Sequence, residues 1–192
     1  PANPYANSKL LFEKYLLKMS KTHSMKFIIL RYFNVAGADP ELRSGLISDT
    51  PTHLIKILSE VAVGKREKIS IFGNDYNTKD GTAIRDYIHV CDLASIHLKA
   101  AKYLLEKKIS NIFNCGYGKG YSVLEVINAA NQIYDNKIMF EFDKRRPGDS
   151  EKLISNVDKL HEHINWKPKF DDLKLIIKTA VEWEKKLNEK NL

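Results

Sequence analysis

Tyr5 and Lys9 form a Y-x-x-x-K pair close to the start of the chain. If this segment is helical, the i,i+4 spacing places both side chains on one face, with about 5–6 Å between their Cβ atoms. An ammonium group held near a phenol favours the phenolate, and such a tyrosine can take a proton from an alcohol at neutral pH. The same spacing also arises when a surface tyrosine lies beside a solvated lysine, so the pair needs support from other residues.

Two further pairs of arginine and aspartate lie on polar segments, Arg85 with Asp86 and Arg146 with Asp149. Two arginines can bracket a diphosphate, because guanidinium forks match phosphate oxygens in pairs. A carboxylate on the same loop can accept hydrogen bonds from ribose hydroxyls, and Phe72, at the end of a predicted strand, can lie against a base. The alternatives are a surface salt bridge, a solvated turn and a core phenylalanine.

The composition describes an ordinary soluble globular protein, with 192 residues, 43% hydrophobic and 29% charged. No apolar run approaches the roughly 20 residues that span a bilayer, so no membrane contact is expected. The net charge is +7, but the lysines are scattered and the densest basic cluster is residues 144–146. A compact basic trio fits a small anionic ligand better than a nucleic acid.

Cys91 and Cys115 are the two cysteines of the chain, and reduced thiols in the cytoplasm are the plainer interpretation of so few. His161 and His163 stand two positions apart without a cysteine pair nearby, so no metal site is predicted. The chain opens on a proline rather than a methionine. We therefore expect it to be part of a longer protein.

Helical and strand patterns alternate along the chain, which predicts an α/β fold. The nearly continuous apolar run at residues 26–33 predicts a parallel strand buried on both faces. Too few strands carry this pattern for a complete sheet. The expected helices are 4–19, 52–63, 92–105 with Asp92 as N-cap, 123–134 after a Ser122 capping box, and 173–187; further strands are expected at 69–72, 83–90, 111–115 and 138–142, with a polar loop at 145–155.

The glycine loop at residues 116–120 reads G-x-G-x-G and not G-x-G-x-x-G. It also lacks the acidic residue about 20 positions further on that holds a ribose in dinucleotide-binding folds. The loop is therefore predicted to be a tight turn between a strand and a helix.

Together these motifs form an ordered series that resembles the UDP-glucose 4-epimerases, which are NAD-dependent extended short-chain dehydrogenases. The resemblance covers essentially the whole chain, and the segment 73–82 is its most specific part. The matching segments are 5–9 (YANSK), 30–38 (LRYFNVAGA), 71–76 (IFGNDY), 80–82 (DGT), 85–90 (RDYIHV), 92–93 (DL), 114–123 (NCGYGKGYSV), 145–149 (RRPGD) and 165–168 (NWKP).

The resemblance implies the chemistry of each position. Tyr5 matches the acid/base, Lys9 the lysine that binds the nicotinamide ribose, and Tyr32 a residue near the nicotinamide. NAD takes a hydride from C4 of the hexose and returns it to the other face of the 4-keto sugar. The UDP portion is expected to lie against Asn34, His53, Leu54, Ser70, Phe72, Arg85, Arg146 and Asp149. Leu153 matches a position where some members carry a bulky tyrosine, so tolerance of UDP-N-acetylglucosamine is expected.

The resemblance also implies the domain organisation, a partial Rossmann-type parallel sheet with a smaller α/β substrate domain. Residues 1–45 match the end of the NAD-binding domain, with 83–106 packing back on it, and 46–192 match mainly the nucleotide-sugar domain. The glycine turn, the first strands and the catalytic Ser/Thr of the family precede the tyrosine. We therefore expect this chain alone to be inactive and poorly soluble until the N-terminal segment of the same protein completes it, and the intact protein to be a homodimer.

Two other functions stay open from the residues. One is a related nucleotide-sugar dehydratase or decarboxylase. The other is a non-catalytic remnant that keeps a nucleotide-sugar pocket. A nucleic-acid binder is the least supported, since it requires steeply salt-dependent binding to duplex.

Overall fold

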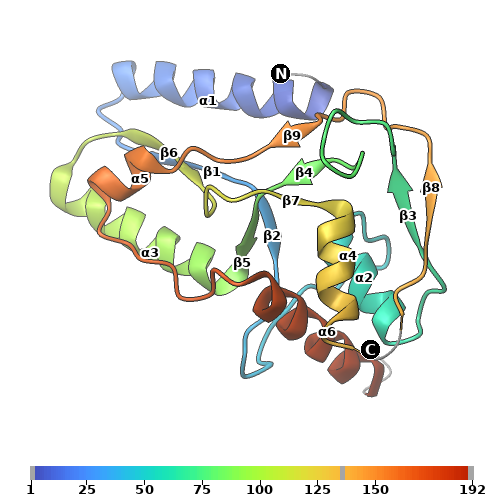
Figure 1. The fold of residues 1–192 in the computed structure, drawn as a ribbon. Coiled ribbons are helices and arrows are strands. Elements are labelled where there is room, and N and C mark those ends of the chain that lie inside the picture. Colours follow the sequence, from blue (N-terminus) through green and yellow to red (C-terminus); the bar gives the residue numbers. More distant parts are fainter. Residues whose placement is uncertain (1–2, 135–136, 190–192) are drawn as a thin grey trace.

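A computed structural model describes residues 3–134 and 137–189 of the chain (Figure 1). Helices and strands alternate, as the sequence predicts. The helices are α1 (Pro4–Thr22), α2 (Leu54–Ala62), α3 (Val90–Lys107), α4 (Val123–Asn131), α5 (Asp158–His163) and α6 (Leu173–Glu189). The strands are β1 (Ile28–Tyr32), β2 (Asn34–Ala36), β3 (Ile69–Phe72), β4 (Ile84–Arg85), β5 (Tyr87–His89), β6 (Asn111–Cys115), β7 (Tyr121–Ser122), β8 (Phe140–Asp143) and β9 (Lys152–Leu153).

Most strand pairs are parallel, which confirms the predicted sheet type. The segment 28–36 is shared between two neighbours: β1 pairs with β6 and β2 pairs with β5, with Ile28 opposite Asn111 and Asn34 opposite Tyr87. β3 pairs with β8 in parallel, and β4 lies between antiparallel β7 and parallel β9. The chain passes from β5 through α3 to β6, and this crossover brings β5 and β6 against the same long segment.

The prediction that residues 26–33 are buried on both faces is wrong. Ile28, Ile29 and Leu30 are half-buried, while Arg31 and Tyr32 are exposed. Within the described chain β1 has a strand partner on one side only, β6. An apolar strand with one neighbour leaves part of its surface to solvent.

Helix α1 begins as its sequence predicts. Asn3 is the N-cap and its side chain accepts a hydrogen bond of 2.8 Å from the amide of Ala6, while Pro4 occupies the first turn. Every residue of α1 remains at least partly exposed, including the large apolar side chains of Leu11 and Phe12. Figure 1 shows α1 along one edge of the molecule, and the described part of the chain leaves Leu11 and Phe12 more than half exposed.

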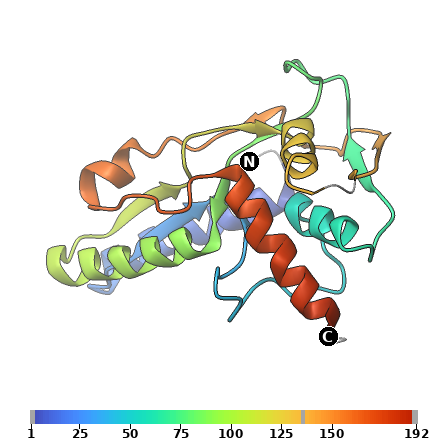
Figure 2. The same ribbon diagram turned by 60° about the horizontal axis from the view of Figure 1, so that its bottom comes forward.

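The core is built from two groups of helices on opposite sides of the strands. Figure 2 shows α2, α4 and α6 together on one side and α3 with α5 on the other. Leu58, Ile127 and Ile177, one from each helix of the first group, are fully buried in the hydrophobic cluster that these helices form. Ile96 and Phe113 are fully buried in the second.

The capping box at the start of α4 is confirmed. Ser122 Oγ accepts from the amide of Glu125 at 3.0 Å, and the Glu125 carboxylate accepts from the amide of Ser122 at 2.8 Å. The helix ends at Asn131, earlier than the expected residue 134.

The prediction of Asp92 as the N-cap of α3 is wrong. The helix begins at Val90, and the preceding His89 caps it by accepting from the amide of Cys91 through Nδ1 at 3.1 Å. Asp92 is buried and accepts from Tyr117 Oη at 2.7 Å and from the amide of Phe170 at 2.9 Å. Its carboxylate binds groups that are distant in the sequence. A capping rule considers only neighbouring residues and therefore cannot predict these bonds.

Several strand boundaries also differ from those predicted. The expected strand at 83–90 is two short strands, β4 and β5, interrupted at Asp86. The last predicted strand is shifted to β8, whose four residues are all exposed. The loop at 145–155 contains β9, because its backbone pairs with β4.

Candidate functional site

A cavity of about 710 Å³ gathers most of the predicted substrate residues. They come from the end of β1, from β2, the start of α2, β3, β4 and the loop after β8. The predicted residues that line it are Tyr32, Asn34, His53, Leu54, Ser70, Phe72, Arg85, Arg146 and Asp149. Tyr5, Lys9 and Leu153 lie outside this lining.

The two arginines reach the cavity from different segments. Arg85 donates to the Asp149 carboxylate, so the ion pair joins β4 to the loop after β8. The guanidinium carbon of Arg146 lies 3.7 Å from the centroid of the Phe72 ring. The alternative interpretation, a surface salt bridge between Arg85 and its neighbour Asp86, is therefore wrong. The structure brings both cations and one aromatic ring to one wall of the cavity.

The first turn of α2 adds a second source of positive potential. Residues 52–57 line the cavity, and the N-cap His53 makes no side-chain capping bond. The first turn also contains no acidic residue. Amide N–H groups at a helix N-terminus attract anions, and here they face the same cavity as Arg85 and Arg146. The arrangement suits a diphosphate.

Asn34 is fixed at the cavity by the adjacent strand. Its side-chain amide donates to the carbonyl of Asp86 at 3.0 Å, and its backbone amide donates to the same carbonyl at 3.1 Å. The side-chain carbonyl is thereby oriented away from Asp86. It can accept a hydrogen bond from a ligand hydroxyl.

Asp86 holds together three segments around the site, a role that the sequence motifs did not reveal. Its buried carboxylate accepts from the amides of Tyr117 at 3.1 Å, Gly118 at 3.0 Å and Ser155 at 3.2 Å. A Cβ at Gly116 would lie 2.5 Å from Asp86 Oδ2, which explains the glycine there. Two amides of the loop 116–120, those of Tyr117 and Gly118, are bound to Asp86, in keeping with the interpretation of this loop as a tight turn.

A second carboxylate fixes the polar segment that follows Phe72. Asp80 accepts from the Thr82 amide at 2.9 Å, from Thr82 Oγ1 at 2.7 Å and from Ser122 Oγ. Burial raises the pKa of Asp80, but the hydrogen bonds from Ser122 and Thr82 outweigh it and the net pKa is lowered. This carboxylate ties the loop to the start of α4.

His89 packs in the core. Its Nε2 lies 3.1 Å from Thr179 Oγ1 and its ring stacks on Phe170 at 4.4 Å between centroids. Burial lowers the pKa of His89, against the opposing charges of Asp92 and Asp39. It is a structural residue that joins α3 to α6.

Tyr5 and Lys9 lie on one face of α1, as their spacing predicts. Lys9 Nζ is 5.1 Å from the centroid of the Tyr5 ring. The Tyr5 side chain is 71% exposed. The pair is therefore available to a ligand, although the cavity lining does not include it.

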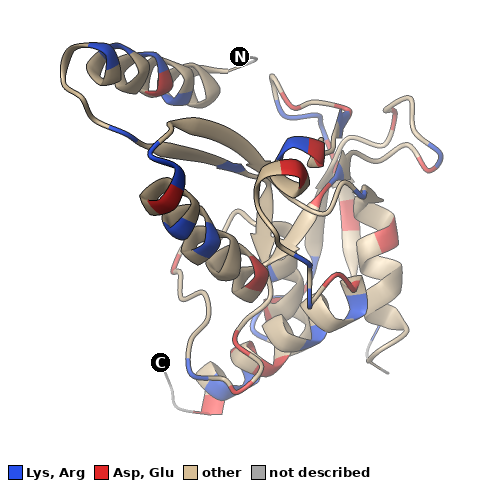
Figure 3. Ribbon diagram, turned by 90° about the vertical axis from the view of Figure 1, so that its left-hand side faces the viewer, with Lys and Arg blue, Asp and Glu red and all other residues tan. Residues whose placement is uncertain are grey.

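Among the residues that the structure describes, the remaining polar side chains give no other candidate centre. Cys91 and Cys115 are free, and burial raises the pKa of Cys115 to about 12. Within residues 3–134 and 137–189, no three His, Cys, Asp or Glu side chains gather as metal ligands do. No helix in the described chain is both long and apolar enough to cross a membrane. Figure 3 shows Lys and Arg interspersed with Asp and Glu on several elements, not gathered in one stripe.

The chain is similar to known proteins along nearly its whole length. Residues 1–116 match the model of the NAD dependent epimerase/dehydratase family. A UDP-glucose 4-epimerase from Azospirillum brasilense is 44% identical over 189 residues, which are 98% of this chain and 54% of that protein. The chain thus spans about half the length of the curated relatives it matches.

Solved structures agree. The UDP-glucose-4-epimerase of Stenotrophomonas maltophila, crystallised with NAD and formylated UDP-arabinopyranose, has a TM-score of 0.93 at 33% identity, over 98% of this chain and 56% of that one. The UDP-Glc/GlcNAc 4-epimerase of Campylobacter jejuni is 49% identical with a TM-score of 0.76, over 96% of this chain and 56% of that one. By sequence motif and by fold, the chain belongs to the NAD dependent epimerase/dehydratase family.

Proposed function

We propose that this chain is the nucleotide-sugar-binding part of an NAD-dependent UDP-hexose 4-epimerase, which interconverts UDP-glucose and UDP-galactose through a 4-keto intermediate. The observation that carries the proposal is the convergence of Asn34, Phe72, Arg85, Arg146 and Asp149 on one cavity, at the start of α2. Two cations and a helix N-terminus supply the charge for the diphosphate. Asp149 is an acceptor for the ribose.

The uracil base can stack on one face of the Phe72 ring. Arg146 covers the other face of that ring at 3.7 Å, so the base lies on the opposite side or displaces the guanidinium toward the diphosphate. Ser70 lies two positions earlier on the same strand and also lines the cavity. Together they recognise the base side of the nucleotide.

The residues around Tyr5 fit the nicotinamide end of NAD. Tyr5 and Lys9 present a phenol and an ammonium on one exposed helix face, and Tyr32 stands at the cavity wall. When bound, NAD supplies the acceptor and donor of the hydride at C4 of the hexose. Tyr5 takes the proton from the C4 hydroxyl and returns it, and Lys9 binds the nicotinamide ribose. Within the loop 116–120 the amides of Tyr117 and Gly118 are bound to Asp86, so we propose that another segment holds the pyrophosphate of NAD.

The domain organisation is part of the same proposal. Residues 1–45 with 83–106 belong to the NAD-binding domain and 46–192 mainly to the substrate domain. An N-terminal segment and a second copy of the intact protein are its partners. The free thiols of Cys91 and Cys115 suit the reducing cytoplasm.

Binding of UDP tests the proposal on the chain itself. Arg146→Met is expected to weaken UDP binding by about 10- to 100-fold, the cost of a lost charge-assisted hydrogen bond. Uridine, which lacks the diphosphate, should bind almost equally to both forms. Isothermal titration at fixed salt measures the two affinities.

Arg145→Met is the matched control, because Arg145 is the neighbouring arginine and lies over Tyr76 at 4.1 Å, outside the cavity. It removes the same charge and should change UDP affinity by less than about threefold. Equal losses in both variants would mean that the attraction is unspecific. A folded chain that does not bind UDP would contradict the proposal.

The breadth of the substrate is a finer proposal that involves Leu153. This residue is on β9, opposite Arg85 of β4 in register, and its side chain is 47% exposed. The Campylobacter jejuni neighbour carries both UDP-Glc and UDP-GlcNAc in its name. A leucine beside the arginine that binds the diphosphate leaves room for an N-acetyl group, so the chain should accept both sugars.

Leu153→Tyr is expected to reduce affinity for UDP-N-acetylglucosamine by about tenfold relative to UDP-glucose, because the larger ring fills the space of the acetyl group. Competition binding with the two nucleotides gives the ratio. Leu105→Tyr, at an exposed leucine on α3, is the control. A ratio that stays the same in Leu153→Tyr would remove this residue from substrate choice.

A further inference from the structure

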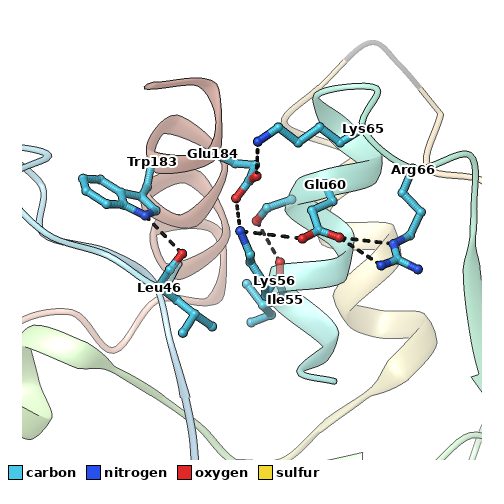
Figure 4. Close-up of polar contacts among 9 residues, drawn as sticks. Leu46, Ile55, Lys56, Glu60, Lys65, Arg66, Trp183 and Glu184 are labelled. Atoms are coloured by element: carbon cyan, nitrogen blue, oxygen red, sulfur yellow. Dashed lines mark hydrogen bonds and ion pairs between the residues drawn. The ribbon is translucent and has the colours of Figure 1, made fainter. Parts of the chain in front are cut away.

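A cluster of charged side chains lies between α2 and α6, with Lys56 and Glu184 buried at its centre (Figure 4). Lys56 is 8% exposed and donates to the carboxylate of Glu184, which is 1% exposed. Lys65 Nζ reaches the other oxygen of Glu184 at 3.0 Å. On the other side, Glu60 lies 3.7 Å from Lys56 Nζ and 3.1 Å from Arg66.

The cluster contacts α2 near both of its ends. Lys56 is in the first turn of this helix and Lys65 stands three residues after its end at Ala62, yet both bind the single carboxylate of Glu184. A buried ion pair rarely adds more stability than apolar side chains of the same volume. Its distinctive effect is register, because only one position of α2 along α6 satisfies both lysines.

The residue next to Glu184 fixes the segment that enters α2. Trp183 Nε1 donates to the carbonyl of Leu46 at 3.2 Å, as Figure 4 shows. A Cβ at Gly45 would lie 2.5 Å from the Trp183 ring, so backbone and indole are in close contact there. Two consecutive residues of α6 thus hold the approach to α2 and the helix itself.

Both partners of the central pair also line the cavity, together with the first turn of α2. We propose that Lys56 and Glu184 are positioning residues for the nucleotide: their ion pair sets the α2 N-terminus where its amides meet the diphosphate. This inference rests on the proposed function for the identity of the ligand. The position of the helix end does not depend on it.

The test removes the central pair, while Glu60 keeps Arg66 as its partner and Lys65 remains partly exposed. Lys56→Met with Glu184→Met keeps the net charge and nearly the volume, so the melting temperature should stay within a few degrees of the original. UDP binding should weaken about tenfold, because helix N-terminal donors lose their alignment with the diphosphate. Amide hydrogen exchange in the ligand-free chain should accelerate at residues 46–57 and remain unchanged in α4.

Two other variants complete the comparison. Glu184→Gln alone leaves two lysines at a buried site and should lower the melting temperature by about 10 °C. Glu182→Met with Lys185→Met removes an exposed pair of α6, with 2.9 Å between its charged atoms, and should change neither UDP affinity nor exchange.

The outcomes are distinct. Full UDP affinity with unchanged exchange in Lys56→Met/Glu184→Met would show that the pair only fills space, and it would overturn the inference. Faster exchange at 46–57 in a chain whose original form does not bind UDP would support the positioning of α2 and contradict the proposed function.

Discussion

Tyr5→Phe is expected to reduce sugar epimerisation by about 10²- to 10⁴-fold, the usual loss when a general acid–base group is removed. The phenol and the Lys9 ammonium lie together on an exposed face of α1, with the lysine 5.1 Å from the ring centroid. Phenylalanine keeps the ring and the helix but cannot carry the proton. The assay follows conversion of UDP-galactose to UDP-glucose by this chain joined to the N-terminal NAD-binding segment of a relative.

The control for this experiment is on the same helix. Tyr15 is also exposed on α1, and Tyr15→Phe removes an identical hydroxyl. It should leave turnover within about twofold, because surface substitutions rarely propagate to a distant site. UDP affinity should be unchanged in both variants, since Tyr5 does not line the cavity. Undiminished turnover in Tyr5→Phe would assign the proton transfer to another group.

Asp86→Asn is expected to destabilise the chain by about 3 kcal/mol, more than most single substitutions. Asp86 is fully buried, and its carboxylate accepts from the amides of Tyr117, Gly118 and Ser155. An asparagine presents one NH₂ group where an acceptor is needed, so at least one buried amide loses its partner. Urea unfolding followed by circular dichroism measures the change.

Asp49→Asn makes the same chemical change on an exposed loop and should alter the unfolding free energy by less than about 0.5 kcal/mol. UDP binding provides a second readout, because Asn34 takes its orientation from the Asp86 carbonyl. That carbonyl remains in Asp86→Asn, so the folded variant should still bind UDP. A loss below 1 kcal/mol would mean that the three loop amides find other acceptors.

Expectations about the elements agree with the structure where the signal is local. The Ser122 capping box and the proline-led start of α1 depend on residues within one turn of each other, and both are confirmed. The parallel pairing of strands is also confirmed. Asp92 shows the limit of such rules, because its carboxylate binds Tyr117 and the backbone at 169–170 in place of its own helix.

The features of the site also divide into those that local sequence predicts and those that depend on residues distant in the sequence. The i,i+4 spacing of Tyr5 and Lys9 places them on one face whatever surrounds α1. The pairing of Arg85 with Asp149, 64 positions apart, could not be read from either motif, since each motif contains its own arginine and aspartate. Lys56 and Glu184, 128 positions apart, had no signal in the sequence because each looks like an ordinary charge on an amphipathic helix.

The sequence by itself determined the helix face of the Tyr5–Lys9 pair, the α/β class and the order of the motifs, because backbone periodicity and capping act over a few residues. The tertiary structure alone decided which charges are paired, which loop amides are committed and which residues share the cavity. Ion pairs and hydrogen bonds act over about 3–4 Å, and only the folded chain brings distant segments within that range.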